Sequence, residues 1–236
     1  MAKKLTKIKE NISEESEMFY NHLRSITDNM VTEIIDTLIK HTNVFVFSGI
    51  IRDFFLDPNK KDFRDVDLII EDDIEIEVIF YNLNIKKNNF GGYKVQNKNT
   101  TIDLWVINKT WGLNNGQLSF AFDVLNTLPK TTFFNFSSIL FHINKKEFIV
   151  GIDFIRFLRD KKIEIVSELN PFPELCIVNT IYYKDKLNLP LGKKLKNYLF
   201  QNFEYNKNKL DTVQIKHFKC VKYSVEYIQK EIEKLK

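Results

Sequence analysis

The stretch from residue 44 to residue 70 constrains the fold of this 236-residue chain more than any other. It predicts a short apolar strand, a Ser48-Gly49 turn, a short helix, a polar loop and a second strand that opens with two aspartates, Asp65 and Asp67. Because successive side chains of a strand point to opposite faces, these two carboxylates should share one face and the apolar residues between them the other. Two carboxylates on one face are typical ligands of a divalent cation, so we expect Mg²⁺ or Mn²⁺ there.

The turn before the short helix predicts a second kind of site, one for phosphate. Gly49 lets the backbone turn sharply, and the helix that begins there directs free N–H groups toward the space in front of the aspartates. A nucleoside triphosphate (NTP) bridged by magnesium would satisfy both halves of the stretch. We therefore expect Ser48 and Gly49 to hold the phosphates, and Arg52 to brace either Asp53 or the phosphates.

The run Ser48-Gly49-Ile50-Ile51-Arg52-Asp53 followed by Asp65-x-Asp67 resembles a known signature. The signature is Gly-Gly-x-Val-Arg-Asp followed by Asp-x-Asp. It belongs to the head domain of class II tRNA nucleotidyltransferases (CCA-adding enzymes) and bacterial poly(A) polymerases, within the DNA polymerase β-like nucleotidyltransferase superfamily. Ser48 stands in place of the first glycine, and the resemblance extends over about residues 40–200.

The resemblance implies an α+β fold: a nucleotidyltransferase-type mixed β-sheet backed by helices and followed by a small C-terminal helical region. We expect residues 1–168 to form the head domain, with N-terminal helices, and residues 169–236 to form a helical, neck-like domain.

Residues 90–96 and 100–106 are predicted to form a pair of strands, and Asp103 lies inside the apolar second strand. A buried carboxylate is costly unless it has a partner. The resemblance implies a third carboxylate on the strand beside Asp65-x-Asp67, and Asp103 is the residue that suits it. Three such carboxylates would repel one another without a cation, whereas two magnesium ions would complete the clamp used for in-line phosphoryl transfer. The alternative is a structural Asp103 that caps a backbone N–H group or pairs with Lys94.

Hydrophobic spacing predicts most of the remaining elements. Asp28 is expected to cap a helix, and residues 74–80 fit either a strand or a helix. The last helix carries apolar residues at alternating spacings of three and four, which fits packing on the preceding helices or, alternatively, a homodimer or other protein contact. The expected helices span 6–26, 28–39, 120–128, 151–158, 174–185, 191–204, 209–216 and 217–235, and a strand at 133–142 should pair with 147–150.

Two departures from the family pattern concern nucleotide binding. Where the family has an Arg-Arg-Asp set that binds triphosphate and sugar, this chain has Thr131 and Thr132, whose hydroxyls are then the candidates for phosphate contact. Asn179 and Tyr182 stand where CCA-adding enzymes carry the arginines that read CTP and ATP. Because that choice requires bidentate donors, standard CCA addition is not expected.

The charge distribution suggests a polyanionic partner. From residue 151 onward there are 17 Lys and Arg against 11 Asp and Glu, with the excess concentrated between 183 and 222. This surplus fits RNA, or alternatively an ordinary solvated helical surface. The two cysteines lie far apart and no apolar run could cross a bilayer, so we expect a cytoplasmic protein without a membrane partner.

These observations predict a metal-dependent nucleotidyltransferase. It would transfer a nucleoside monophosphate from an NTP to a hydroxyl group of RNA, such as a tRNA 3′ end. Asp65, Asp67 and Asp103 would be the catalytic and metal-binding residues, and Asp103 would also activate the attacking hydroxyl. The alternatives are a catalytically inactive member that serves as a binding or partner module, and a toxin-type or defence-type transferase that modifies a protein.

Overall fold

A computed structural model describes residues 2–47, 49–61, 63, 65–88, 91–96, 100–110, 113 and 124–235. One seven-stranded sheet has the order β3-β4-β5-β2-β1-β6-β7. The strands are β1 (Val44–Phe47), β2 (Asp65–Ile70), β3 (Ile85–Lys87), β4 (Tyr93–Gln96), β5 (Thr101–Val106), β6 (Ile139–His142) and β7 (Glu147–Val150). Among the described strands, β2 and β5 run parallel and every other neighbouring pair is antiparallel. The mixed sheet confirms the predicted fold class.

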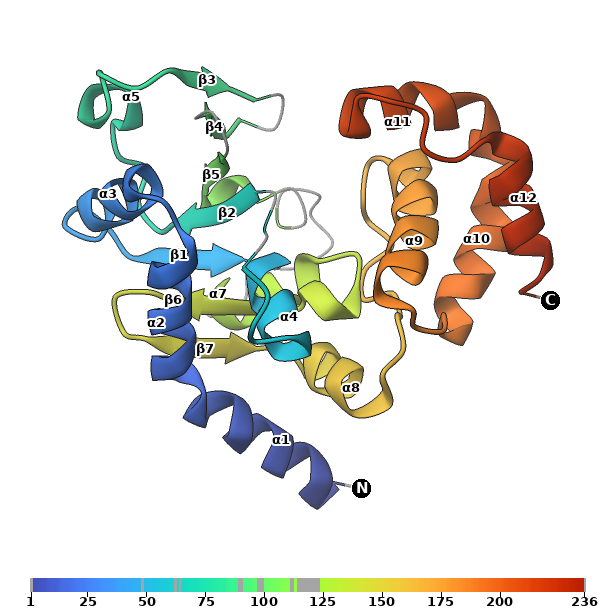
Figure 1. The fold of residues 1–236 in the computed structure, drawn as a ribbon, viewed down its shortest axis with the longest axis horizontal. Coiled ribbons are helices and arrows are strands. Elements are labelled where there is room, and N and C mark those ends of the chain that lie inside the picture. The colour runs from blue at the N-terminus through green and yellow to red at the C-terminus, as the bar shows by residue number, and fades with distance from the viewer. Residues whose placement is uncertain are drawn as a thin grey trace.

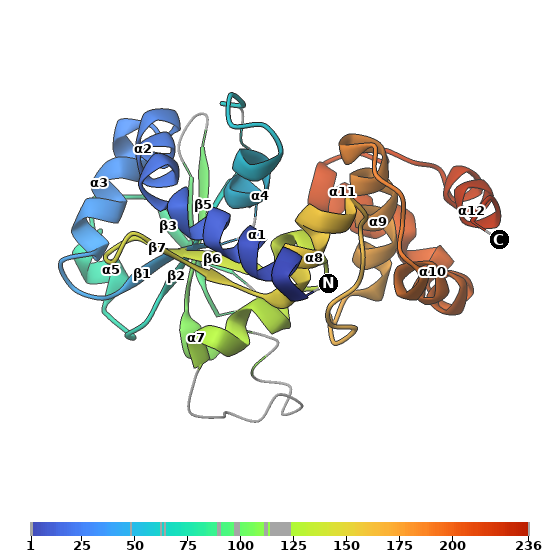
Figure 2. The same cartoon turned by 90° about the horizontal axis from the view of Figure 1, so that it is seen from below.

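Helices cover both faces of the sheet and form a separate group beyond it. They are α1 (Ala2–Glu14), α2 (Ser16–Ile26), α3 (Asn29–Leu38), α4 (Gly49–Leu56), α5 (Ile76–Ile79), α7 (Val124–Thr127), α8 (Ile152–Asp160), α9 (Pro173–Leu187), α10 (Lys193–Asn206), α11 (Leu210–Phe218) and α12 (Val225–Glu233). Short 3₁₀ helices are η1 (Ile107–Lys109), η2 (Leu128–Thr131), η3 (Asn135–Ser137) and η4 (Lys207–Lys209). Helices α9 to α12 lie together at one side of the sheet (Figure 1). Figure 2 shows α2, α3 and α4 on one face of the sheet and α7 on the other.

The two faces of β2 differ as predicted. Val66, Leu68 and Ile70 are fully buried in the main core, which continues under the covering helices. The opposite face carries Asp65 and Asp67 at the start of the strand and, further along, Ile69, which belongs to a second and smaller apolar cluster beneath η2. On this face, the N-terminal half of β2 is therefore the part that remains accessible for a functional site.

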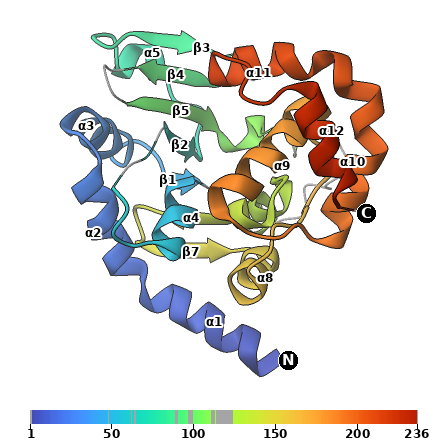
Figure 3. The same cartoon turned by 45° about the vertical axis from the view of Figure 1, so that its right-hand side comes forward.

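The C-terminal helices pack around α9 (Figure 3). The buried Gln214 side chain donates to Tyr223 O and accepts from the backbone N–H groups of Lys222 and Tyr223, so it fixes the connection from α11 to α12. This arrangement confirms the predicted C-terminal helical region. Across the described ranges, no helix combines the length and the apolar run that a bilayer crossing requires.

The structure corrects two predictions for the helices. The helix predicted at 6–26 is two helices, because the chain turns at Glu15 and lets α1 pack on α8 while α2 packs on α4. The last helix begins at Val225 and not at residue 217, because Lys219 adopts a left-handed conformation that ends α11 and Ser224 caps the next helix. Residues 74–80, for which strand and helix both remained open, contain the short helix α5.

Two strand predictions also change. The segment 133–142 is a strand only from Ile139 onward, because Asn135 donates to Lys162 O and accepts from Glu164 N, so the first half pairs with that segment and not with the sheet. Strand β3 was not predicted from the sequence. Much of the predicted helix at 120–128 lies outside the described residues, and its described part is α7 followed by η2.

Candidate active site

The strand register places a row of side chains across the sheet with two acids at its centre. Asp67 of β2 is the Cα partner of Phe47 in β1 and of Asp103 in β5. Asp103 is in turn the partner of Lys94 in β4, and Lys94 is the partner of Lys86 in β3. Because directly opposite residues of neighbouring strands point to the same face, the two carboxylates lie side by side, with an aromatic ring on one side and two lysines on the other.

Asp65 lies one step away from this pair. It shares the face of Asp67 and has Thr101 as its Cα partner. A rise of about 3.3 Å per residue separates the two β2 aspartates by about 6.6 Å along the strand. Among the described residues, Asp67 and Asp103 line the adjacent cavity and Asp65 does not. The structure therefore brings two of the three predicted acids to one cavity and leaves the third beside it.

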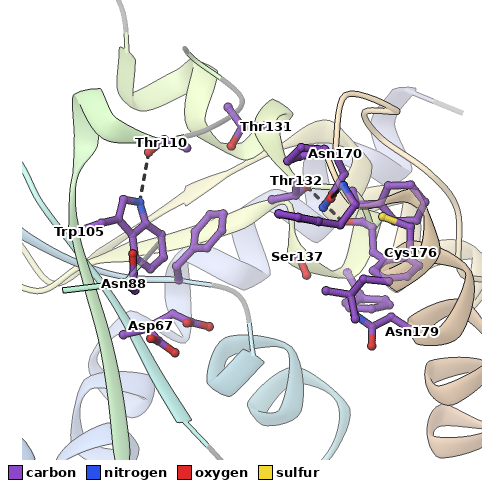
Figure 4. Close-up of a pocket in the computed structure, with 18 of the residues that line it drawn as sticks. Asp67, Asn88, Trp105, Thr110, Thr131, Thr132, Ser137, Asn170, Cys176 and Asn179 are labelled. Carbon is purple, nitrogen blue, oxygen red and sulfur yellow. Dashed lines mark hydrogen bonds between the residues drawn. The ribbon is translucent and has the colours of Figure 1, made fainter. Parts of the chain in front are cut away.

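The cavity has a volume of about 500 Å³ and extends from the two acids to α9. Figure 4 shows Asp67 at one end and Asn170, Cys176 and Asn179 at the other. Much of its wall is aromatic: Phe47, Trp105, Phe133, Phe134, Phe136, Phe172 and Tyr183. Trp105 is held by a hydrogen bond from Nε1 to Thr110 Oγ1 of 3.2 Å. The cavity is thus charged at the sheet and largely apolar toward the helical half.

Two lysines at the charged end are ion-paired. Lys94 Nζ lies 3.3 Å from Asp103 Oδ1, which is the structural alternative that the sequence offered for Asp103. Lys109 donates to Asp73 with a distance of 2.9 Å. The Asp103 side chain keeps 23% of its surface exposed and Lys94 keeps 45%, so solvent reaches this ion pair.

The acids suit a cation that brings further ligands with it. Within the described ranges, no three acidic, histidine or cysteine side chains form a cluster that could hold a metal ion without other ligands. Mg²⁺ in nucleotide sites is commonly held by one or two carboxylates together with phosphate oxygens and water. The Asp67 and Asp103 pair fits that manner of binding.

The predicted phosphate turn is described only in part. Ser48 lies outside the described residues. Gly49 is the first residue of α4 and follows Phe47, the Cα partner of Asp67, by two positions. The N-terminus of α4 therefore begins close to the acidic pair, where its free N–H groups favour an anion.

Arg52 is buried beneath the site and does not line the cavity. Its side chain is only 4% exposed, and its Nη2 lies 2.6 Å from Asp53 Oδ1. The guanidinium also lies over the rings of Phe136 and Tyr183, at 5.2 and 5.0 Å from their centroids. Burial alone would raise the pKa of Asp53, but Arg52 and Lys60 lower it. Of the two roles expected from the sequence, the structure shows the contact with Asp53.

Thr131 and Thr132 line the cavity, but their hydroxyl groups donate to backbone carbonyl oxygens of the protein. Thr131 Oγ1 donates to Leu128 O, and Thr132 Oγ1 lies within 3.1 Å of both Pro129 O and Phe134 O. Both side chains are buried. A hydroxyl has one proton to donate, so these contacts leave the threonines as acceptors toward the cavity.

From the sequence, Asn179 was noted only as a residue that stands where the family has an arginine, and Tyr183 was not identified as a site residue. Both line the cavity, and Asn179 Oδ1 is buried without a hydrogen-bond partner. A buried acceptor left without a donor costs free energy. Helical spacing could have identified this surface, since Leu175, Asn179 and Tyr183 follow one another at intervals of four on α9.

Comparison with known proteins gives structural similarity only. No model of a known protein family matches the sequence, and no curated protein matches it. A CCA-adding enzyme solved with CTP has a TM-score of 0.62 and 16% identity, and the match covers 91% of this chain and 53% of that one. The complex of a CCA-adding enzyme with ATP has a TM-score of 0.63 with 15% identity and the same coverage. A tRNA nucleotidyltransferase complexed with a primer tRNA and an ATP analogue has a TM-score of 0.51 with 16% identity, covering 72% of this chain and 51% of that one.

This chain therefore spans about half the length of these enzymes and shares their nucleotidyltransferase fold.

Proposed function

We propose that this protein is a metal-dependent nucleotidyltransferase that transfers a nucleoside monophosphate from an NTP to a hydroxyl group of RNA. The observation that carries the proposal is the pairing of Asp67 with Asp103 on neighbouring strands, at the charged end of a cavity of about 500 Å³. The fold shared with CCA-adding enzymes supports it.

The proposed roles follow from position. Asp67 and Asp103 would hold a divalent cation together with the triphosphate, and Asp65 would be the third carboxylate of a two-cation site. Bound cations would stabilise the charge that develops on the phosphoryl oxygens. A carboxylate oxygen of Asp103 would accept the proton of the attacking hydroxyl. The hydroxyl oxygen would then bond to the α-phosphorus, and pyrophosphate would leave. Ser48 and Gly49 would bind the phosphates, since Gly49 is the first residue of α4.

The base would lie toward α9. Aromatic rings on the cavity wall offer stacking surfaces, and the Asn179 amide on the same wall would accept from an exocyclic amino group once its buried Oδ1 turns toward the cavity. ATP and CTP, the nucleotides bound in the similar CCA-adding enzymes, both carry such a group. A single amide cannot replace two arginines, so the proposal does not extend to ordered addition of C and A.

The acceptor RNA would contact the helical half, which we propose as a separate domain beginning near residue 169. Several lysines between 183 and 222 are exposed there: Lys186, Lys193, Lys194, Lys207, Lys209, Lys216, Lys219 and Lys222. Lys222 Nζ also lies 4.4 Å from the centroid of the Tyr182 ring. Exposed cations beside an aromatic ring suit a phosphate backbone with unstacked bases. One of the similar structures is bound to tRNA, which makes a tRNA 3′ end the first acceptor to test.

The test is transfer of label from each α-labelled NTP to total RNA with Mg²⁺ or Mn²⁺. Asp67→Asn and Asp103→Asn should each lower the rate at least about a hundredfold, because charge stabilisation by a metal contributes several kcal/mol. Asp65→Asn shows whether the third carboxylate takes part. Asp57→Asn, at an exposed loop position, is the matched control and should leave the rate unchanged.

Two outcomes would overturn this proposal. Label transfer that survives both Asp67→Asn and Asp103→Asn would show that the chemistry lies elsewhere. Tight NTP binding without transfer to any RNA would favour a catalytically inactive binding module.

A further inference from the structure

The ion pair between Lys94 and Asp103 is built into the sheet. The two residues are Cα partners on antiparallel strands, so their side chains leave the same face directly opposite each other. Strand β4 is fixed on both sides, by β3 and by β5. It also begins in tight contact with β5, because a Cβ at Gly92 would meet Leu104 O at 2.7 Å. The backbone therefore holds the base of the Lys94 side chain opposite Asp103, with the carboxylate within reach of the ammonium group.

Lys94 also differs from the other cavity lysine in its partner. Lys109 pairs with Asp73, which is not one of the cavity-lining residues, whereas Lys94 pairs with an acid of the proposed cation site. The neighbouring Asp67 and Asp103 carboxylates repel each other when both are ionised. An ammonium group 3.3 Å from Asp103 Oδ1 offsets part of that repulsion.

We propose that Lys94 is a counter-cation that competes with the divalent cation for Asp103 and turns to the triphosphate when the nucleotide binds. This inference rests on the proposed nucleotidyltransferase function and adds a positioning residue to it. Without nucleotide, the ammonium group keeps Asp103 partly neutralised and weakens metal binding. With nucleotide, the phosphates attract the ammonium group, and the acid becomes available to the cation that arrives with them.

The inference predicts effects of opposite sign on two binding equilibria. Removing the charge with Lys94→Met should tighten Mn²⁺ binding to the nucleotide-free protein about tenfold, from Coulomb's law for a partly solvated site. The same substitution should weaken binding of ATP in the presence of EDTA several-fold, because one cation near the phosphates is lost. A lysine with a purely structural role would not strengthen one equilibrium while weakening the other.

The experiment measures free Mn²⁺ by electron paramagnetic resonance and labelled ATP by equilibrium dialysis, on the full chain. Lys94→Arg keeps the charge and should behave as wild type in both titrations. Lys86→Met is the matched control, since Lys86 is an exposed lysine on the same face and one strand further from Asp103. Its effects should be clearly smaller than those of Lys94→Met.

The outcomes separate this inference from the function on which it rests. If Mn²⁺ binding is abolished by Asp103→Asn but unchanged by Lys94→Met, the counter-cation role is wrong and the metal site stands. If Lys94→Met and Lys86→Met change Mn²⁺ affinity equally, the effect is general surface charge and the inference is also wrong. If the protein binds Mn²⁺ neither alone nor with ATP, both the inference and the proposed function are overturned.

Discussion

Replacing Arg52 by methionine should cost the protein much of its stability. The guanidinium forms the centre of a buried contact in which Asp53 supplies the opposite charge and the Phe136 and Tyr183 rings supply two faces. Tyr183 belongs to α9, so the same side chain connects α4 with the helical half. Methionine would keep most of the apolar contact and remove the charge.

The structure sets the size of the effect. Breaking a buried ion pair by removing one partner costs about 3–5 kcal/mol. Losing each cation–π contact adds about 0.5–1 kcal/mol to this cost. Lys60, whose Nζ lies 2.6 Å from Asp53 Oδ2, still compensates part of the negative charge that the substitution leaves on Asp53. We therefore expect a loss of about 3 kcal/mol in the free energy of unfolding. For a chain of this length that corresponds to a Tm lower by about 6–12 °C.

Urea unfolding followed by circular dichroism measures this loss, and Arg159→Met is the matched control. Arg159 also pairs with the aspartate that follows it, but those side chains are 20% and 26% exposed, compared with 4% and 14% for Arg52 and Asp53. The control should lose far less stability. Equal losses for the two variants, or a loss below about 1 kcal/mol for Arg52→Met, would refute the reasoning.

The same contact predicts a pH dependence. The pKa of Asp53 is lower in the folded protein than in the unfolded chain, despite its burial, because of Arg52 and Lys60. Its contribution to stability is therefore present above a pH of about 4 and is lost as the pH falls through the lowered pKa. Acid titration of the unfolding free energy should show a shallower decline between pH 4 and 2 in Asp53→Asn than in wild type.

Three further predictions follow from local geometry. Gly92→Ala should lower the unfolding free energy by about 1–3 kcal/mol, because its Cβ would meet Leu104 O at 2.7 Å; an unchanged urea midpoint would contradict this. Asp28→Ala should cost about 1–2 kcal/mol, since Asp28 accepts from Val31 N and from Thr100 Oγ1, and Asp28→Asn should recover part of the loss in the same assay. Burial raises the pKa of Cys176 to about 12, so Ellman's reagent at pH 8 should titrate the exposed Cys220 alone in native protein and both thiols after unfolding.

Much of the sheet could be predicted because its strands carry strong local patterns. The alternation in 65–70 separates the acids from the core residues, and the structure reproduces it. The side-by-side position of Asp67 and Asp103 required more, because the parallel register of β2 and β5 depends on contacts between segments far apart in the chain. The resemblance to a known signature supplied that expectation, and periodicity alone could not.

The parts that were not predicted depend on single side chains acting over long distances in the sequence. Asn135 forms hydrogen bonds with the backbone of Lys162 and Glu164, so its segment does not join the sheet. Gln214 fixes the loop between α11 and α12, so the last helix begins later in the chain than predicted. The α9 end of the cavity was missed for a related reason. Asn179 is informative only when its buried oxygen is seen to lack a partner, which no sequence pattern reports.

The location of the cation is the most direct test of the proposed chemistry. Crystals of the protein with Mn²⁺ and a non-hydrolysable ATP analogue should give an anomalous scattering peak between the Asp67 and Asp103 carboxylates, with the analogue's phosphates completing the coordination. That peak should disappear in Asp103→Asn. A nucleotide bound in the cavity with no Mn²⁺ at this pair, or Mn²⁺ bound by other residues, would contradict the proposed site.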